Sequence, residues 1–382
     1  MNFEIDQDDT ALQDATRRFA ETYLAPVAAS ADRDAAFPEG HIGQLAEFGA
    51  MGLNLPSEYG GTGAPATGLA LAVEEIAAAC AATASTVTAH FLATDTILLG
   101  GGEAMRRRWL PDAAAGRKLG AFALTEPGAG SDPADMSMQA VREGDGYRLQ
   151  GTKHFITNGG VADFITVFAK TDPTAGYRGI SAFVVDADTP GFEVGAAENT
   201  MGIRASHIYE LRFDCLLPAE NLIGEEGSGF RTAMRVLDRG RVEIAATACG
   251  IARAALEAAL GWVGTRKISG QPLADFQAIQ FMLADMKTEL EAARLMTLRA
   301  AALRETGERF TREAAMAKLF ASEAVHRITD QALQIHGGYG YTSGLPLERY
   351  VRDARILRIF EGSSEIQRNI IARSELGNSK AR

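Results

Sequence analysis

The chain has 382 residues, of which 46% are hydrophobic, and its formal net charge is −11. A chain of this length is expected to form two or three packed units rather than one. The excess of acidic residues disfavours a nucleic-acid-binding protein, because such proteins need a basic face to follow phosphates. The composition is that of a soluble globular protein.

The first predicted unit is a helical domain over residues 1–118. Apolar residues recur at helical spacing near its start, at Leu12, Ala15, Phe19 and Tyr23. Residues 74–93 are rich in alanine and contain little that would break a helix. No Arg or Lys occurs between Glu74 and Thr88.

The second predicted unit is a β-domain over residues 119–226. Short apolar runs rich in β-branched and aromatic residues occur at 119–125, 164–170 and 180–185. Residues 207–215 alternate between polar and apolar side chains, which predicts a half-buried strand.

The third predicted unit, residues 227–382, is helical again. A long apolar seam with steps of three and four residues runs through Phe276, Ile279, Leu283, Met286 and Leu290. Such a seam packs on another helix. The order of helices, then strands, then helices argues against an alternating α/β sheet.

Features that bear on the compartment are few. The N-terminus lacks the basic start, apolar stretch and cleavage site of a secretory signal. No charge-free apolar stretch is long enough to cross a bilayer. Cys80, Cys215 and Cys249 are isolated, so we expect free buried thiols in a reducing compartment. The predicted location is cytoplasmic, without membrane association.

Several common catalytic motifs are absent. The glycine-rich segments at 128–130 and 337–340 lack the spacing and the strand-to-helix context of a dinucleotide-binding turn. The sequence has no phosphate-binding loop, no HExxH pair and no serine flanked by glycines as in hydrolases. His90, His154 and His336 have no metal-ligand spacing, so we expect structural histidines and no metal site.

Two segments of the β-domain have the composition of a ligand-binding face. Residues 122–132, FALTEPGAGSD, run from a strand into a turn in which glycines permit close backbone approach and Thr125 and Ser131 offer hydroxyls. Residues 151–160, GTKHFITNGG, place the aromatic Phe155 and the hydroxyl of Thr157 on a strand that ends in a tight turn. Together they predict a site for a flat ligand.

These two segments resemble the flavin-binding strands of the acyl-CoA dehydrogenase family. The resemblance continues at 201–206 (MGIRAS), 218–224 (PAENLIG), 237–241 (LDRGR), 266–270 (RKISG), 334–338 (QIHGG) and 360–367 (FEGSSEIQ). It implies the three-domain fold of that family: an N-terminal helical domain, a β-barrel-like middle domain and a C-terminal four-helix bundle, with FAD between the last two.

The resemblance also assigns roles to individual positions. It implies that Glu361 is the catalytic base, which removes the α-proton of an acyl thioester. The residues implied to line the flavin are Phe122, Leu124, Thr125, Ser131, Phe155 and Thr157. Those implied to bind the FAD diphosphate and adenosine of a neighbouring subunit are Arg266, Gln277, Gln334, Gly337 and Gly338, with Ser363 and Glu365 at the pyrophosphate end. The residues implied to touch the CoA thioester are Ser131, Asp238, Arg241 and Gly362.

Local reasoning about Glu361 agrees with this assignment. Ser364 and Gln367 have the spacing of a capping box, which places Glu361 on the turn before a helix. Backbone amides there favour the carboxylate, whereas enclosure by ligands would raise its pKa. A few members of the family carry the base at the position of Gly240, and glycine cannot serve as one.

The implied reaction is the α,β-dehydrogenation of an acyl-CoA to a trans-2-enoyl-CoA, with the flavin accepting the β-hydride. Electrons would pass to electron-transfer flavoprotein, and the enzyme would be a homotetramer built as a dimer of dimers. Alternatives are an oxidase on the same scaffold, a family member repurposed for another CoA thioester, and a non-catalytic helical scaffold. The resemblance leaves the acyl chain length open.

Overall fold

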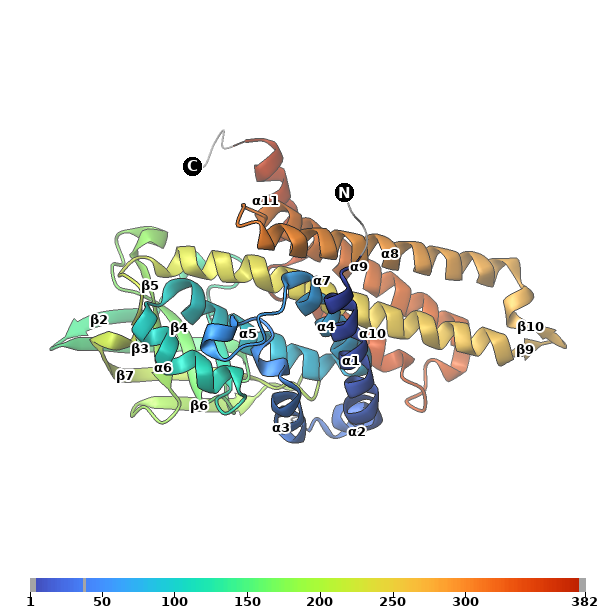
Figure 1. The fold of residues 1–382 in the computed structure, drawn as a ribbon, viewed down its shortest axis with the longest axis horizontal. Coiled ribbons are helices and arrows are strands. Elements are labelled where there is room, and N and C mark those ends of the chain that lie inside the picture. Colours follow the sequence, from blue (N-terminus) through green and yellow to red (C-terminus); the bar gives the residue numbers. More distant parts are fainter. Residues whose placement is uncertain (1–4, 37–38, 378–382) are drawn as a thin grey trace.

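A computed structural model describes residues 5–36 and 39–377. It contains two helical regions joined by a β-domain, which confirms the predicted fold class (Figure 1). The β-domain lies at one end of an elongated molecule, and the long helix α7 (Gly229–Thr265) runs from it toward the other end, where α8 (Gln277–Glu305) and α9 (Thr311–His336) lie beside it.

The N-terminal region is helical, as predicted. Its helices are α1 (Gln7–Phe19), α2 (Ala25–Asp34), α3 (Glu39–Phe48), α4 (Ala66–Ala79), α5 (Ala81–Gly100) and α6 (Glu103–Ala114). The single helix expected over residues 74–93 is wrong. Cys80 adopts an extended conformation, with φ −152° and ψ 102°, and this residue separates α4 from α5.

The middle region is one sheet with the strand order β6-β7-β3-β2-β4-β5-β8, and β1 pairs in parallel with β4. The strands are β1 (Gly120–Ala123), β2 (Gln139–Glu143), β3 (Gly146–Thr157), β4 (Phe164–Lys170), β5 (Ile180–Asp186), β6 (Phe192–Ala197), β7 (Ile208–Pro218) and β8 (Leu222–Ile223). The alternation predicted for β7 is confirmed, since Leu211, Phe213 and Cys215 are buried and Arg212 and Asp214 are exposed.

The C-terminal region is a helical bundle. Its elements are α7 (Gly229–Thr265), the short strands β9 (Lys267–Ile268) and β10 (Gln271–Pro272), α8 (Gln277–Glu305), α9 (Thr311–His336), α10 (Leu347–Arg355) and α11 (Ser364–Glu375). The seam predicted for α8 packs inward, with Met286 and Leu290 buried. The β9–β10 hairpin was not anticipated, because each of its strands is only two residues long.

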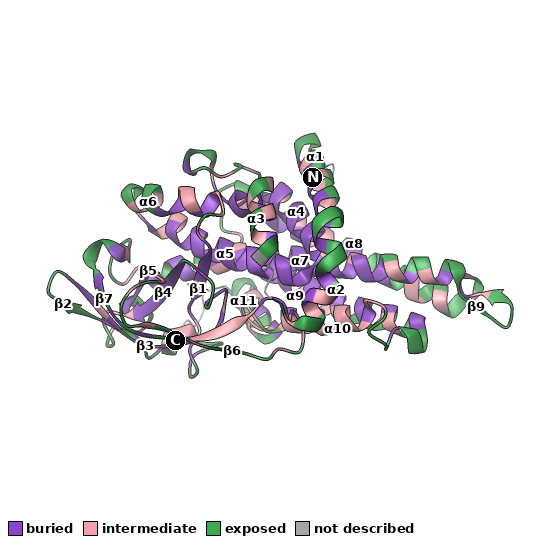
Figure 2. Ribbon diagram, turned by 90° about the horizontal axis from the view of Figure 1, so that it is seen from below, coloured by how far each residue is buried: buried purple, intermediate pink, exposed green. Residues whose placement is uncertain are grey.

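Helix α7 is the central element of the molecule. It packs against α4, α5, α8 and α9, and Figure 2 shows it almost entirely buried along its middle. Among the described residues it is the one helix long and apolar enough to cross a membrane by composition. Since 67% of its most apolar stretch is buried inside the protein, α7 has the character of a core helix.

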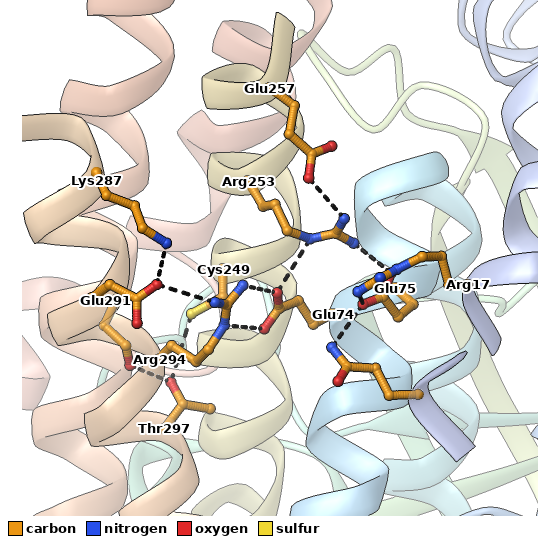
Figure 3. A network of polar contacts seen from close by, with 12 residues as sticks. Arg17, Glu74, Glu75, Cys249, Arg253, Glu257, Lys287, Glu291, Arg294 and Thr297 are labelled. Carbon is orange, nitrogen blue, oxygen red and sulfur yellow. Dashed lines mark hydrogen bonds and ion pairs between the residues drawn. The ribbon is translucent and has the colours of Figure 1, made fainter. Parts of the chain in front are cut away.

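A buried network of charges fixes the N-terminal helices on this bundle (Figure 3). Glu75 of α4 accepts from Arg17 of α1 at 2.8 Å and from Arg253 of α7 at 2.5 Å. Its neighbour Glu74 pairs with Arg253 at 3.3 Å and with Arg294 of α8. Both carboxylates are almost completely buried, and their hydrogen bonds to arginines of three other helices offset the cost of that burial.

Candidate active site

Glu361 lies on a strained turn immediately before α11. Its φ is +51°, a left-handed conformation that costs a non-glycine residue about 1–3 kcal/mol. Gly362 follows with φ +94°. The predicted position of Glu361, on the turn before a capped helix, is confirmed. A strained backbone of this kind persists only where surrounding groups hold it.

The predicted capping box is wrong in its register. Ser363, not Ser364, is the N-cap, and its hydroxyl accepts from the Ile366 N–H at 3.4 Å. Gln367 does not reach back to the cap, because its Nε2 donates to the carbonyl oxygens of Glu361 (3.2 Å) and Gly362 (2.9 Å). The spacing rule requires Glu or Gln three residues after the cap, which Ser364 has and Ser363 lacks, so the sequence pattern favoured the wrong one of two adjacent serines.

The Glu361 carboxyl group lies in surroundings that disfavour its negative charge. Its Oε2 atom is shielded from solvent and has no hydrogen-bond partner. Burial, together with the negative charge of Glu243, raises the pKa of Glu361 to about 8, against the opposing charges of Lys318 and Arg241. A carboxylate with a raised pKa is a stronger base than an exposed one, and can remove a proton from a weak carbon acid.

Gly240 of α7 provides the space that this carboxylate occupies. A Cβ atom built on Gly240 would overlap Glu361 Oε2 and would lie 2.7 Å from Leu92 Cδ2. Position 240, which carries the base in some family members, and the Glu361 side chain therefore compete for the same volume. A side chain at one of them excludes the present arrangement of the other.

The two predicted ligand-binding segments lie side by side. The His154 N–H donates to the Thr125 carbonyl at 2.9 Å. Beneath them Lys153 and Glu126 form a buried ion pair at 2.9 Å, and Lys153 also donates to the Leu124 carbonyl at 3.0 Å. This pair joins β3 to the segment after β1, so it holds the two halves of the predicted flavin face together.

The predicted flavin residues differ in exposure. Phe155 has φ +57° and is 57% exposed, and it stacks on His154 with ring centroids 4.1 Å apart. A break in the β3–β7 register between Lys153 and Ile156 accompanies this exposure. Phe122, Thr125 and Thr157 are half-buried and Ser131 is exposed. Leu124 differs, since its side chain is buried in the core and leaves only its backbone near that face.

Asp238 and Arg241, predicted to touch the thioester, form an ion pair one helical turn apart on α7. Asp238 also accepts from the Thr311 hydroxyl at the start of α9. Arg241 is buried and its Nε has no partner. Its charge acts on Glu361, so the pair lies in the electrostatic surroundings of the base.

A hollow lies at the other end of the bundle from Glu361, and we name it the second hollow because the surroundings of Glu361 form the first candidate region. It has a volume of about 690 Å³, and its lining includes Arg266, Gln334, Gly337 and Gly338. The Arg266 guanidinium lies 5.9 Å from the centre of the Trp262 ring. A Cβ atom on either glycine would meet no atom within 4 Å, so the backbone there is open to a ligand.

The sequence-predicted residues at this hollow are brought together with one exception. Gln277, the first residue of α8, is absent from the lining, although its neighbours Phe276 and Ala278 belong to it. Trp262, Tyr339 and His336 line the hollow and were not predicted to bind the cofactor through their side chains. His336 stacks on Trp262 with centroids 4.9 Å apart.

The three histidines have the structural roles expected of them. His90 is buried, its Nδ1 accepts from the Gly120 N–H at 2.9 Å, and burial lowers its pKa to about 4. His154 Nε2 lies 3.0 Å from Glu198 Oε1, and His336 Nδ1 lies 2.7 Å from the Ala332 carbonyl. Within the described part of the chain no three His, Cys, Asp or Glu side chains are grouped as metal ligands.

Sequence reasoning missed two charged residues next to Glu361. Lys318 is fully buried and donates to the Gly362 carbonyl at 2.7 Å. Glu243 is buried on α7, where Arg304 donates to its Oε1 at 3.3 Å and its Oε2 has no partner. The available signal was a single charge within an otherwise apolar run, AAMAKLFA for Lys318 and VEIAA for Glu243.

The helical, β and helical regions and the shielded Oε2 atom of Glu361 can be compared with known proteins. The chain matches three domain families: the N-terminal domain of acyl-CoA dehydrogenases over residues 6–117, the middle domain over 121–216 and the C-terminal domain over 227–376. The chain therefore belongs to the acyl-CoA dehydrogenase family of oxidoreductases.

Individual relatives match over almost their whole length. The short-chain specific acyl-CoA dehydrogenase of mouse mitochondria is 46% identical over 97% of this chain and 90% of its own. An NADH-dependent acryloyl-CoA reductase of Anaerotignum propionicum is 43% identical, over 98% of this chain and 95% of its own. The structure of butyryl-CoA dehydrogenase from Megasphaera elsdenii superposes with a TM-score of 0.97 at 42% identity, covering 99% of this chain and all of the other.

Proposed function

We propose that the chain catalyses the FAD-dependent α,β-dehydrogenation of a short acyl-CoA thioester to the trans-2-enoyl-CoA. Glu361 removes the α-proton. The observation that carries the proposal is the Glu361 carboxyl group, whose Oε2 atom is shielded from solvent, lacks a hydrogen-bond partner and lies against a glycine. The short acyl class rests on the names of the mouse and Megasphaera relatives.

The chemistry asks for a base and for stabilisation of charge on the thioester carbonyl. The α-proton of a thioester is weakly acidic, so charge that builds on the oxygen must meet donors already aimed at it. Glu361 supplies both a carboxylate for the proton and, through its backbone N–H, one such donor. Its strained φ of +51° fixes the side chain and the N–H relative to one another.

The residues of the chain fit FAD at both candidate regions. The exposed Phe155 ring and the half-buried hydroxyls of Thr125 and Thr157 suit the flat flavin. In the second hollow, Arg266 suits the diphosphate because its planar fork pairs with phosphate oxygens. Gly337 and Gly338 allow close backbone approach there. When bound, FAD supplies the acceptor for the β-hydride, and this chain aligns the thioester with it.

We infer that one subunit does not hold both halves of the cofactor. Gly240 lies beside the proposed base, and Arg266, the C-cap of the same helix α7, lies at the second hollow. The two residues are 26 positions apart, which corresponds to about 39 Å along the helix at 1.5 Å per residue. That span is too long for a single dinucleotide. We therefore propose that the second hollow serves the FAD of a neighbouring subunit, in a homotetramer built as a dimer of dimers.

The proposed partner rests on the family, and the proposed compartment on three free, buried cysteines, which suit a reducing environment. Electrons would leave to electron-transfer flavoprotein, and the enzyme would act in the cytoplasm. The 43% identity to an acryloyl-CoA reductase favours a second candidate, reduction of a short 2-enoyl-CoA by the same residues. The two differ in direction, and Glu361 would then return a proton to the α-carbon.

An anaerobic bleaching screen tests the proposal. The purified protein should carry a yellow flavin that bleaches on addition of butyryl-CoA, and more slowly with longer acyl chains. Glu361→Gln should keep the flavin but not bleach, whereas the control Glu375→Gln, at the exposed end of α11, should bleach normally. Bleaching of Glu361→Gln at the rate of the unmodified protein would remove Glu361 from the mechanism. Peroxide release in air at the rate of turnover would indicate an oxidase instead.

A further inference from the structure

Two fully buried side chains donate hydrogen bonds to the turn that carries Glu361. Lys318 Nζ donates to the Gly362 carbonyl at 2.7 Å, and Gln367 Nε2 donates to the carbonyls of both Glu361 and Gly362. Neither Lys318 nor Gln367 has any exposed surface. Their donors bind the carbonyls of the two left-handed residues, so they oppose relaxation of the backbone there.

Lys318 is unusual in that its ammonium group binds a neutral carbonyl rather than a carboxylate. A buried ammonium without a counter-ion is costly, and of the negative charges that act on it, Glu361 has the largest effect. Burial lowers the pKa of Lys318 to about 8, while the charge of Glu361 raises it. The lysine and the base therefore stabilise one another's charged forms.

Glu243 opposes this effect from the other side. It lies one helical turn along α7 from Gly240, so both face the same side of the helix, and Gly240 touches the Glu361 carboxyl. Burial raises the pKa of Glu243 to about 7, and its Oε2 has no partner. Two buried carboxylates that interact in this way cannot both ionise easily.

Other charged groups around the cluster come from every helix packed against it. Helix α7 contributes Asp238, which pairs with Arg241, and also Arg239. Asp95 of α5 and Arg304 of α8 act on Glu243. Glu323 of α9 and Glu365 of α11 act on Lys318. Each of these has a partner or acts on a neighbour rather than directly on Glu361. Lys318, Arg241 and Glu243 are the charges that reach the base.

We propose that Lys318 is a positioning residue for Glu361, which holds the left-handed turn through the Gly362 carbonyl and supplies the positive charge that counters Glu243. This rests on the proposed role of Glu361 as the base. It extends that role, because two buried residues of opposite charge, Lys318 on α9 and Glu243 on α7, would set the pKa of the base.

The proposal predicts opposite shifts in two variants of similar shape. Lys318→Met removes a positive charge and should raise the pKa of Glu361 by about 1 unit, whereas Glu243→Gln removes a negative charge and should lower it. The pKa is read from the infrared stretch of the protonated Glu361 carboxyl group, identified by its loss in Glu361→Gln. Lys287→Met, an exposed lysine of α8, serves as the control and should leave the pKa unchanged.

A second lysine variant covers the case in which Lys318→Met does not fold. Lys318→Gln keeps a donor for the Gly362 carbonyl without the charge, so it should fold and still raise the pKa. The Glu243→Gln arm is independent of both. Shifts in the same direction for the Lys318 and Glu243 variants, or no shift in either, would overturn the proposal.

Failure of this proposal and failure of the proposed function can be told apart. The infrared titration needs no substrate, so it reports on the charges even if no acyl-CoA is oxidised. Opposite pKa shifts together with full activity of Glu361→Gln would support the charge effects of Lys318 and Glu243 and would contradict the role of Glu361 as the base. If the pKa did not shift and Glu361→Gln were inactive, Glu361 would remain the base, but Lys318 would not control its pKa.

Discussion

Substitution of Gly240 by alanine tests the packing around the proposed base. The added methyl group would overlap Glu361 Oε2 and press on Leu92, both of which lie in a closely packed interior. Either the Glu361 carboxylate or helix α7 must move. Because Gly240 itself performs no chemistry, any loss of activity reports the displacement of Glu361.

The size of the effect follows from two opposed contributions. Overpacking of a core costs about 1–3 kcal/mol, whereas replacement of a helical glycine by alanine gains about 1 kcal/mol. The net expectation for Gly240→Ala is a loss of about 0–2 kcal/mol in unfolding free energy. A displacement of the carboxylate by about 1 Å should lower kcat about 100-fold, so activity should fall far more than stability.

Gly261→Ala on the same helix is the matched control. A Cβ atom there meets nothing within 4 Å, so this variant should keep full kcat and gain about 1 kcal/mol. Steady-state kinetics with butyryl-CoA and denaturant unfolding of the two variants make the comparison. If Gly240→Ala turned over at the rate of the unmodified enzyme, the reasoning that places Glu361 against Gly240 would be refuted.

Three further predictions concern buried charges. Glu75→Gln should lower the unfolding free energy by about 1.5–3 kcal/mol, because it removes the charge-assisted hydrogen bonds that the buried carboxylate accepts from Arg17 and Arg253. The exposed Glu257→Gln should cost less than about 1 kcal/mol, and equal denaturation midpoints would contradict this. Lys153→Met should weaken flavin retention and stability, and Glu126→Gln in the same chain should restore part of the stability, since no buried carboxylate then lacks its cation. Because the base must be ionised and the pKa of Glu361 is raised to about 8, kcat/KM should fall about tenfold per unit as pH drops below 8, and a flat profile from pH 6 to 8 would be incompatible with it.

The sequence predicted the long elements of the fold but not the short ones. The seam of α8 and the alternation of β7 follow from repeated spacing, and the structure has both. The break at Cys80 has no local signal, because alanine, cysteine and alanine in a row carry no helix-stopping residue. The break arises from tertiary packing, which overrides local propensity.

The candidate site shows the same division. Family motifs identified Glu361 and the second hollow, but not the groups that tune the base. Lys318 and Glu243 are separated from Glu361 by 43 and 118 residues, so only the folded chain brings them together. Backbone strain at Glu361 also escapes the sequence, because glutamate is not a residue that favours a positive φ.

Exchange of the α-proton is the most direct measurement of the role of Glu361. A butyryl-CoA in deuterated buffer, incubated with the flavin-loaded enzyme under anaerobic conditions, reports proton removal by mass without dependence on any electron acceptor. The unmodified enzyme and Glu375→Gln should incorporate deuterium at the α-carbon, and Glu361→Gln should reduce the rate at least about 100-fold. Undiminished exchange in folded, flavin-loaded Glu361→Gln would show that another residue removes the proton.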